Sequence, residues 1–213
     1  MSTGHRPFSA RRTTVVVGDW DRRPIVVSFA SERQVRERVD YAGVARLEQY
    51  AFFTSVVDHF EHGVPWEETE FYQYKLESTE SGHYESKEKL DRRFGELSDL
   101  YESMRQAGYK SQRELQNVDS DYVPLGKDFK SPPERGEVAV AIGRDGEILH
   151  VDGRHRLTVA RLLEINEIPV RVVARHAKWQ QLRKRVATAS GPGEVLKQTE
   201  VSVDHPDLRG LVE

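Results

Sequence analysis

The segment from Val138 to Val173 constrains the fold most, because strand, turn and helix signals follow one another there at short intervals. Two segments that read as strands, residues 138–142 and 147–151, flank Gly143-Arg144-Asp145-Gly146, and an Asp-Gly pair supplies the positive φ angles that a tight hairpin requires. After a polar turn at 152–156, apolar residues at helical spacing run over 157–163, with Asn166 at the helix end and a further strand over 168–173. The order β-hairpin, turn, helix, strand predicts an α+β domain.

The preceding half of the chain is predicted to be mainly helical. Apolar residues from Leu90 to Met104 recur at spacings of four, three, four and three, which is typical of one helix face. Gly108 is placed to end that helix in the left-handed conformation, and Ser111 with Glu114 has the pattern of a capping box. Further helices are expected over residues 44–60 and from Pro65, and residues 13–17 and 25–29 read as an edge hairpin.

Breaker residues divide the chain into three predicted parts. Asp, Pro, Gly and Lys accumulate between Gln116 and Glu137, and residues 189–193 read as a flexible connection. We therefore expect an N-terminal strand pair with a helical region over 1–123, a core domain over 124–190 and a C-terminal tail over 191–213.

Composition excludes several classes of chemistry. The chain has no cysteine, so disulfides, thiolate metal sites and cysteine nucleophiles are ruled out. The net charge is −3, yet residues 137–190 carry ten basic and six acidic side chains. This distribution favours a local anionic ligand over extensive coating by nucleic acid, with ordinary solvated surface charge as the alternative. Without a long apolar run or a signal-like N-terminus, we expect no membrane span and a cytoplasmic location.

The turn at residues 152–156 has the chemistry of an anion site. A glycine after a strand lets a ligand approach the backbone, and the first amides of the following helix favour negative charge. Arg154 and Arg156 add guanidinium groups suited to phosphate oxygens, and His155 can transfer a proton near neutral pH. The structural alternative is that Asp152 caps the helix and that the arginines pair with surface carboxylates.

Residues 148–160, followed by Glu167-Ile168-Pro169-Val170, resemble the signature of the ParB/sulfiredoxin-like superfamily, over roughly residues 124–176. The resemblance implies that Gly153, Arg154, His155 and Arg156 bind nucleotide phosphates. Known members include CTP-hydrolysing partition proteins, ATP-dependent sulfiredoxins and an ADP-dependent serine kinase. Arg154 stands where sulfiredoxins carry the catalytic cysteine, so sulfinic-acid repair is excluded. Only 37 residues follow His176, fewer than partition proteins use for DNA binding and dimerisation, so that role is not expected.

The resulting prediction is a nucleotide-dependent phosphotransferase, kinase-like, or a phosphohydrolase that acts on a small molecule. ATP, ADP or CTP would bind with Mg²⁺, Asp152 would be the metal ligand or base, and His155 would orient or transfer a proton. Asp19 and Asp21 are further carboxylate candidates. His176 and Trp179, just after the last predicted strand, would contact the nucleotide, unless Trp179 anchors the final helix as a packing residue.

Two alternatives belong to other classes of protein. One is a non-catalytic, nucleotide-gated or DNA-associated binding module, for which Lys184 and its arginine neighbours would contact nucleic acid. The other is an interaction protein in which the turn is purely structural.

Overall fold

The computed structural model describes residues 13–19, 21, 51–80, 86–119 and 132–212. The chain forms two compact units, each built from discontinuous segments: unit 1 comprises residues 1–42, 139–152 and 170–213, and unit 2 comprises 43–138 and 153–169. Helices and one small mixed sheet confirm the α+β class. The predicted boundary at 123/124 lies outside the described residues, and the division into three parts stays a prediction.

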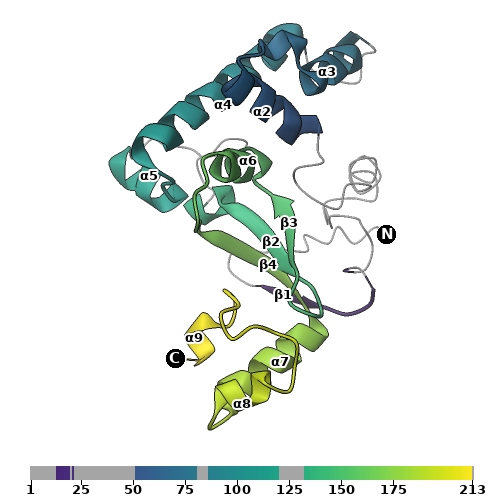
Figure 1. The fold of residues 1–213 in the computed structure, drawn as a ribbon, viewed down its shortest axis with the longest axis vertical. Coiled ribbons are helices and arrows are strands. Elements are labelled where there is room, and N and C mark those ends of the chain that lie inside the picture. Colours follow the sequence, from purple (N-terminus) through teal and green to yellow (C-terminus); the bar gives the residue numbers. More distant parts are fainter. Residues whose placement is uncertain (1–12, 20, 22–50, 81–85, 120–131, 213) are drawn as a thin grey trace. The chain divides into compact units, whose positions relative to one another are not determined.

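Unit 1 contains the four-stranded sheet, in the order β1-β4-β2-β3 (Figure 1). Its strands are β1 (Thr14–Val16), β2 (Val138–Ile142), β3 (Ile148–Asp152) and β4 (Val170–His176). The hairpin predicted around the Asp-Gly turn is confirmed, because β2 and β3 pair antiparallel, with an irregularity between Ala139 and Val140. β4 runs three residues beyond the predicted strand and begins after Pro169, which has no N–H to donate.

Strand β1 is at the sheet edge, as predicted, but its described partner is not a hairpin neighbour. It pairs in parallel with β4, with Val15 opposite Arg175. The predicted second strand, residues 25–29, lies outside the described residues.

Among the described residues of unit 1, three helices follow the sheet: α7 (Ala177–Thr188), α8 (Pro192–Leu196) and α9 (Arg209–Val212). They gather at the end of β4 (Figure 1). Trp179 from α7, Leu196 from α8 and Leu208 just before α9 are all at most 1% exposed. Burial of these side chains holds the C-terminal segment on α7.

The described part of unit 2 is helical, and α4 is the longest element in it (Figure 1). Its elements are α2 (Ala51–His62), the 3-10 turn η3 (Trp66–Glu68), α3 (Glu70–Glu80), α4 (Lys87–Ala107), α5 (Gln112–Val118), the 3-10 turn η4 (Pro133–Gly136) and α6 (Arg154–Leu162). The predicted α4 stripe is confirmed, with Leu90, Phe94, Leu97 and Met104 buried. Gly108 follows α4 with φ 70°, and the Ser111–Glu114 capping box is formed.

Two predicted helix boundaries in unit 2, one start and one end, are wrong. The helix expected from Pro65 is a single 3-10 turn, and α3 begins only after Thr69, whose backbone is extended. Helix α6 ends at Leu162 rather than near Asn166. Glu164 adopts φ 52°, and the Ile165 and Glu164 amides donate to the Ala160 and Arg161 carbonyls. This is a Schellman ending with glutamate in the position that glycine usually takes.

The β2–β3 turn is clamped by a buried ion pair within unit 1. The Arg144 backbone N–H and Nε donate to Asp21 Oδ2 at 2.7 and 2.8 Å, and the two side chains are 7% and 1% exposed. The hydrogen bond from Arg144 lowers the pKa of Asp21 from its ordinary 3.8 to about 2, although burial opposes the change. Asp21 therefore stabilises the fold above pH 4, and that contribution is lost as pH falls through about 2.

Asp21→Asn should lower the free energy of unfolding at pH 7 by about 2 kcal/mol, because Arg144 would stay buried without its main counter-charge. The loss should shrink as pH falls from 4 towards 2, and urea denaturation at several pH values measures it. Asp145→Asn, at an exposed position in the same turn, is the control and should change stability by less than about 0.5 kcal/mol. Equal effects of the two substitutions would contradict the clamp.

Candidate anion-binding pocket

The predicted turn begins helix α6 at a glycine that cannot easily be replaced. Gly153 is the N-cap residue, with φ 85° and ψ 30° in the left-handed region. A Cβ atom there would lie 2.8 Å from Val138 Cα, closer than real Cβ atoms approach backbone. Asp152 is the last residue of β3 and is exposed, and the N-cap position that the structural alternative gave to it is taken by Gly153. Gly153 fits because both the conformation and the space require it.

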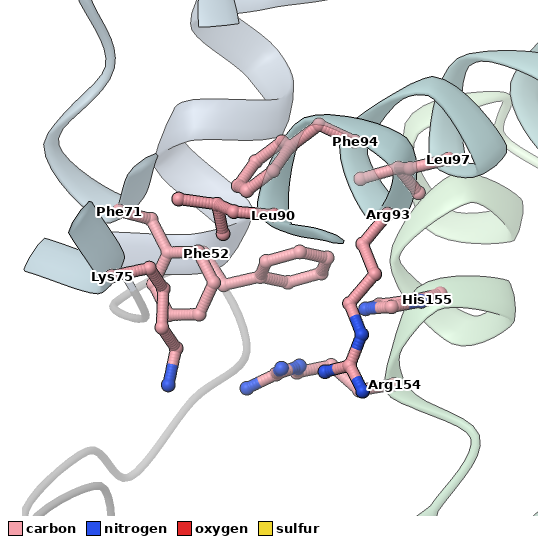
Figure 2. Close-up of a pocket in the computed structure, with 9 residues that line it drawn as sticks. All are labelled: Phe52, Phe71, Lys75, Leu90, Arg93, Phe94, Leu97, Arg154 and His155. Carbon is pink, nitrogen blue, oxygen red and sulfur yellow. The ribbon is translucent and has the colours of Figure 1, made fainter. Parts of the chain in front are cut away.

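A cavity of about 140 Å³ opens next to the first turn of α6 and lies wholly within unit 2. The described residues that line it come from α2, α3, α4 and α6 (Figure 2): Phe52, Phe71, Lys75, Leu90, Arg93, Phe94, Leu97, Arg154 and His155. Arg154 and His155 are thus two predicted site residues that the structure brings to one pocket.

Cations converge on one side of this pocket. In Figure 2 the nitrogen-bearing ends of Lys75, Arg93 and Arg154 lie together, while Leu90 and Phe94 lie on the other side. Burial lowers the pKa of Lys75, and the charges of Arg154 and Arg93 lower it further. Like charges held this close raise one another's energy unless an anion lies between them.

Aromatic rings hold two of these cations and the histidine in place. The Arg154 guanidinium carbon lies 4.4 Å from the Phe52 ring centroid and 5.2 Å from that of Phe71. Lys75 Nζ is 5.4 Å from the Phe71 centroid. His155 stacks on Phe52, with centroids 5.1 Å apart and an interplanar angle of 28°. Cation–π contacts of this kind orient the charged group.

Arg156 is on the same helix but contacts a different part of unit 2. Its Nε donates to the Tyr109 hydroxyl at 3.0 Å, and its guanidinium carbon is 4.2 Å from the Tyr109 ring centroid. It also donates to the Lys110 carbonyl and lies 4.0 Å from the Glu137 carboxylate. The predicted binding of phosphate by Arg156 stays a prediction, and in this structure Arg156 joins the α5–η4 region to α6.

Glu137 is the buried acceptor in that second cluster. It accepts hydrogen bonds from the Tyr109 hydroxyl at 3.2 Å and from the Gln112 N–H at 2.5 Å, and it is 7% exposed. Burial raises the pKa of Tyr109 to about 12, against the nearby charge of Arg156. The cluster is a satisfied polar network that fixes the position of α5 within the unit.

His176 and Trp179 lie in unit 1, where each has the contacts of a packing residue. The His176 Nδ1 accepts from the Lys178 N–H at 3.1 Å, and Nε2 lies 2.9 Å from the Gly18 carbonyl oxygen. Trp179 is fully buried, and its Nε1 donates to Asp207 at 2.8 Å. These contacts agree with the expectation that Trp179 anchors the last helices, and nucleotide contacts by either residue stay a prediction. Asp19 and Asp21, the further carboxylate candidates, both pair with Arg144.

The described lining residues do not by themselves fit a Mg²⁺ site. Mg²⁺ prefers oxygen ligands, whereas the polar groups around the described pocket are nitrogen-bearing. Across the described part of the chain, His, Asp and Glu side chains form no group of three or more able to hold a metal. Nor does any helix in the described ranges combine the length and apolar character needed to cross a membrane.

Comparison of the chain with protein-family models, with curated proteins and with solved structures gives no match. Sequence reasoning missed Lys75, Arg93 and the rings of Phe52 and Phe71. They lie on helices far from the turn along the chain, and no local motif marks them.

Proposed function

We propose that this protein is a ParB/sulfiredoxin-like nucleotide-binding phosphotransferase or phosphohydrolase. Its nucleotide would place a phosphate at the cationic side of the pocket, between Lys75, Arg93 and Arg154. The observation that carries the proposal is the convergence of these three cations beside the first turn of α6 (Figure 2). Positive charges in a partly desolvated pocket stabilise the negative charge of the phosphoryl group in the transition state. Positioning and this electrostatic stabilisation account for most of the catalysis of phosphoryl transfer.

The size of the cavity determines how a nucleotide would bind. Pockets that enclose a drug-sized ligand measure about 300–1,000 Å³, and this one measures about 140 Å³. Only the phosphate end of a nucleotide would enter, and the base and ribose would lie outside.

His155 is the proposed residue for proton transfer in the pocket, and the role predicted for Asp152, which is not among the described lining residues, stays a prediction. His155 lines the pocket with its ring against Phe52, and histidine exchanges protons near neutral pH. Asp152 precedes the Gly153 turn directly in the chain. In the proposed step the acceptor oxygen forms a bond to the terminal phosphorus, its proton passes to His155, and the bridging P–O bond breaks with its electron pair on the nucleotide oxygen.

Calorimetry with ATP, ADP and CTP, each with and without Mg²⁺, tests the proposal. Arg154→Met should weaken binding of the preferred nucleotide by about 10- to 100-fold, because a charge-assisted hydrogen bond to phosphate contributes about 1.5–3 kcal/mol. Arg113→Met is the matched control: Arg113 is exposed on α5 and pairs with Glu134, so its removal should leave affinity unchanged.

Two outcomes contradict the proposal. One is that none of the three nucleotides binds to the wild type. The other is salt-dependent DNA binding without nucleotide turnover, which the DNA-associated alternative expects. That alternative draws on the basic face of α7, where Arg183 already lies 3.4 Å from the Asp207 carboxylate.

A further inference from the structure

The surface that a ligand would meet in the pocket belongs mainly to its polar side chains. The five apolar lining residues are each at most 6% exposed, so they form the wall behind the pocket and offer a ligand little contact: Phe52, Phe71, Leu90, Phe94 and Leu97. The other described lining residues are Lys75, Arg93, Arg154 and His155 (Figure 2). A ligand of this pocket would therefore be held by charge and hydrogen bonds.

The three cations come from three different helices and meet in one place. Lys75 is on α3, Arg93 on α4 and Arg154 on α6, and their nitrogen-bearing ends lie together in Figure 2. Lys75 Nζ and the Arg154 guanidinium carbon lie 5.4 and 5.2 Å from the centroid of the same ring, Phe71. Lys75 and Arg154 are both half-buried, which strengthens the field between them. A group placed there is stabilised more strongly the more negative charge it carries.

Phosphate groups differ in the charge and in the number of free oxygens that they would bring to such a place. The terminal phosphate of a monoester has three free oxygens and a charge of about −1.5 to −2 at pH 7, because its second pKa is about 6. The phosphate of a diester has two free oxygens and one charge, as in a nucleic-acid strand. A terminal phosphate thus offers one free oxygen to each of the three cations, and charge-assisted hydrogen bonds of this kind are short and strong.

We infer that the pocket selects the dianionic terminal phosphate of a phosphomonoester over singly charged anions, through Lys75, Arg93 and Arg154. This inference rests on the proposed function, since it names the part of the nucleotide that the same pocket recognises. The nucleotide would enter with the free end of its phosphate chain. A phosphate with a substituent on both sides would bind weakly, whether it belongs to a blocked nucleotide or to a nucleic-acid strand.

Calorimetry with three small anions tests the inference on the wild-type chain, at about pH 8, where methyl phosphate is a dianion. The probes are methyl phosphate, methyl sulfate and dimethyl phosphate. Methyl sulfate has the same three free oxygens as methyl phosphate but one charge, and dimethyl phosphate has two free oxygens and one charge. Methyl phosphate should bind at least about 10-fold more tightly than either. If methyl sulfate or dimethyl phosphate binds as tightly as methyl phosphate, the inference is wrong.

A lysine substitution locates the selectivity in the pocket. Lys75→Met should reduce the preference for methyl phosphate over methyl sulfate to less than about threefold, because one of the three charges is gone. Lys197→Met is the matched control: it removes the same charge from an exposed side chain in unit 1 that pairs with Glu194, and it should leave the preference unchanged. If thermal melting shows that Lys75→Met does not fold, Arg93→Met, at an exposed position, takes its place with the same expected result. A folded pocket variant with the wild-type preference contradicts the assignment.

A blocked nucleotide separates this inference from the proposed function. Diadenosine tetraphosphate has an adenosine at both ends of its phosphate chain and so has no terminal phosphate, and it should bind at least about 10-fold more weakly than ATP. If it binds as tightly as ATP, the nucleotide site stands and recognition of the terminal phosphate is wrong. If methyl phosphate shows the expected preference and ATP, ADP and CTP do not bind, the terminal-phosphate site stands and the proposed nucleotide-dependent function is wrong.

Discussion

Replacing Gly153 by alanine should lower the free energy of unfolding by about 2–4 kcal/mol. A left-handed conformation costs a residue with a Cβ about 1–2 kcal/mol, and Gly153 has φ 85°. The added methyl would also lie 2.8 Å from Val138 Cα and 3.3 Å from Val138 N. Backbone atoms cannot rotate away as a side chain can, so the turn or the start of β2 must move. Urea denaturation measures the loss, and calorimetry with nucleotide should show weaker binding.

Gly95→Ala is the control within the same unit. Gly95 is an exposed residue inside helix α4, and its Cβ would meet nothing within 4 Å. Alanine is favoured over glycine in a helix interior by about 0.5–1 kcal/mol, so this substitution should stabilise the protein. The two substitutions should therefore change the free energy of unfolding in opposite directions. A Gly153→Ala protein as stable as the wild type would show that the turn accommodates a side chain, and the argument for a glycine-specific anion turn would fail.

The local parts of the fold could be predicted from sequence because a few neighbouring residues determine them. An Asp-Gly pair between two strand segments is enough to specify the β2–β3 hairpin, and four buried residues at helical spacing specify α4. The Ser111–Glu114 capping box is likewise complete within four residues. In each case the interaction that stabilises the element joins residues close in sequence.

Two parts of the fold were missed for different reasons. β1 pairs in parallel with β4, a choice that nothing in the sequence of residues 13–17 encodes. Glu164 ends α6 in a left-handed conformation because the Schellman hydrogen bonds of the turn hold it there, against the usual preference for glycine or asparagine. The pairing of β1 is decided by residues far apart in sequence, whereas the end of α6 is a local exception to the usual residue preference.

The candidate site likewise contains residues that a local sequence pattern marks and residues that only the packing of helices brings together. The turn that carries Arg154 and His155 has a local pattern, so it could be singled out from the sequence. Lys75 and Arg93 read as ordinary charges on amphipathic helices, and only the packing of α3 and α4 brings them to Arg154 (Figure 2). The sequence around Arg156 predicted a phosphate contact just as it did for Arg154. The Arg156 guanidinium contacts Tyr109, however, and does not line the described pocket. The direction of each side chain on the first turn of α6 determines which arginine enters the pocket, and the sequence pattern alone does not give that direction.

Asp207→Asn should destabilise unit 1 by about 3 kcal/mol or more, because one carboxylate serves three donors. It accepts from Arg175 Nε at 2.8 Å and Nη2 at 2.5 Å and from Trp179 Nε1 at 2.8 Å, and Arg183 Nη1 lies 3.4 Å away. Burial alone would raise the pKa of Asp207, but hydrogen bonds from Arg175 and Trp179 make the net change a lowering. An uncharged amide of the same shape leaves two arginines, 15% and 19% exposed, without their counter-charge, and breaking a buried pair in this way costs about 3–5 kcal/mol.

The pH dependence and a double substitution separate this charge effect from lost packing. Because the pKa of Asp207 is lowered in the folded state, its contribution is present above the ordinary value near 3.8 and is lost on acidification, so the difference between wild type and Asp207→Asn should narrow at low pH. Removing one excess cation by Arg183→Met in the Asp207→Asn background should recover part of the stability. Asp204→Asn, at an exposed position nearby, should change stability by less than about 0.5 kcal/mol. If the Asp207→Asn deficit is independent of pH and Arg183→Met makes it larger, then Asp207 acts through shape and hydrogen bonding to Trp179, and the C-terminal segment is held on α7 by packing rather than by charge.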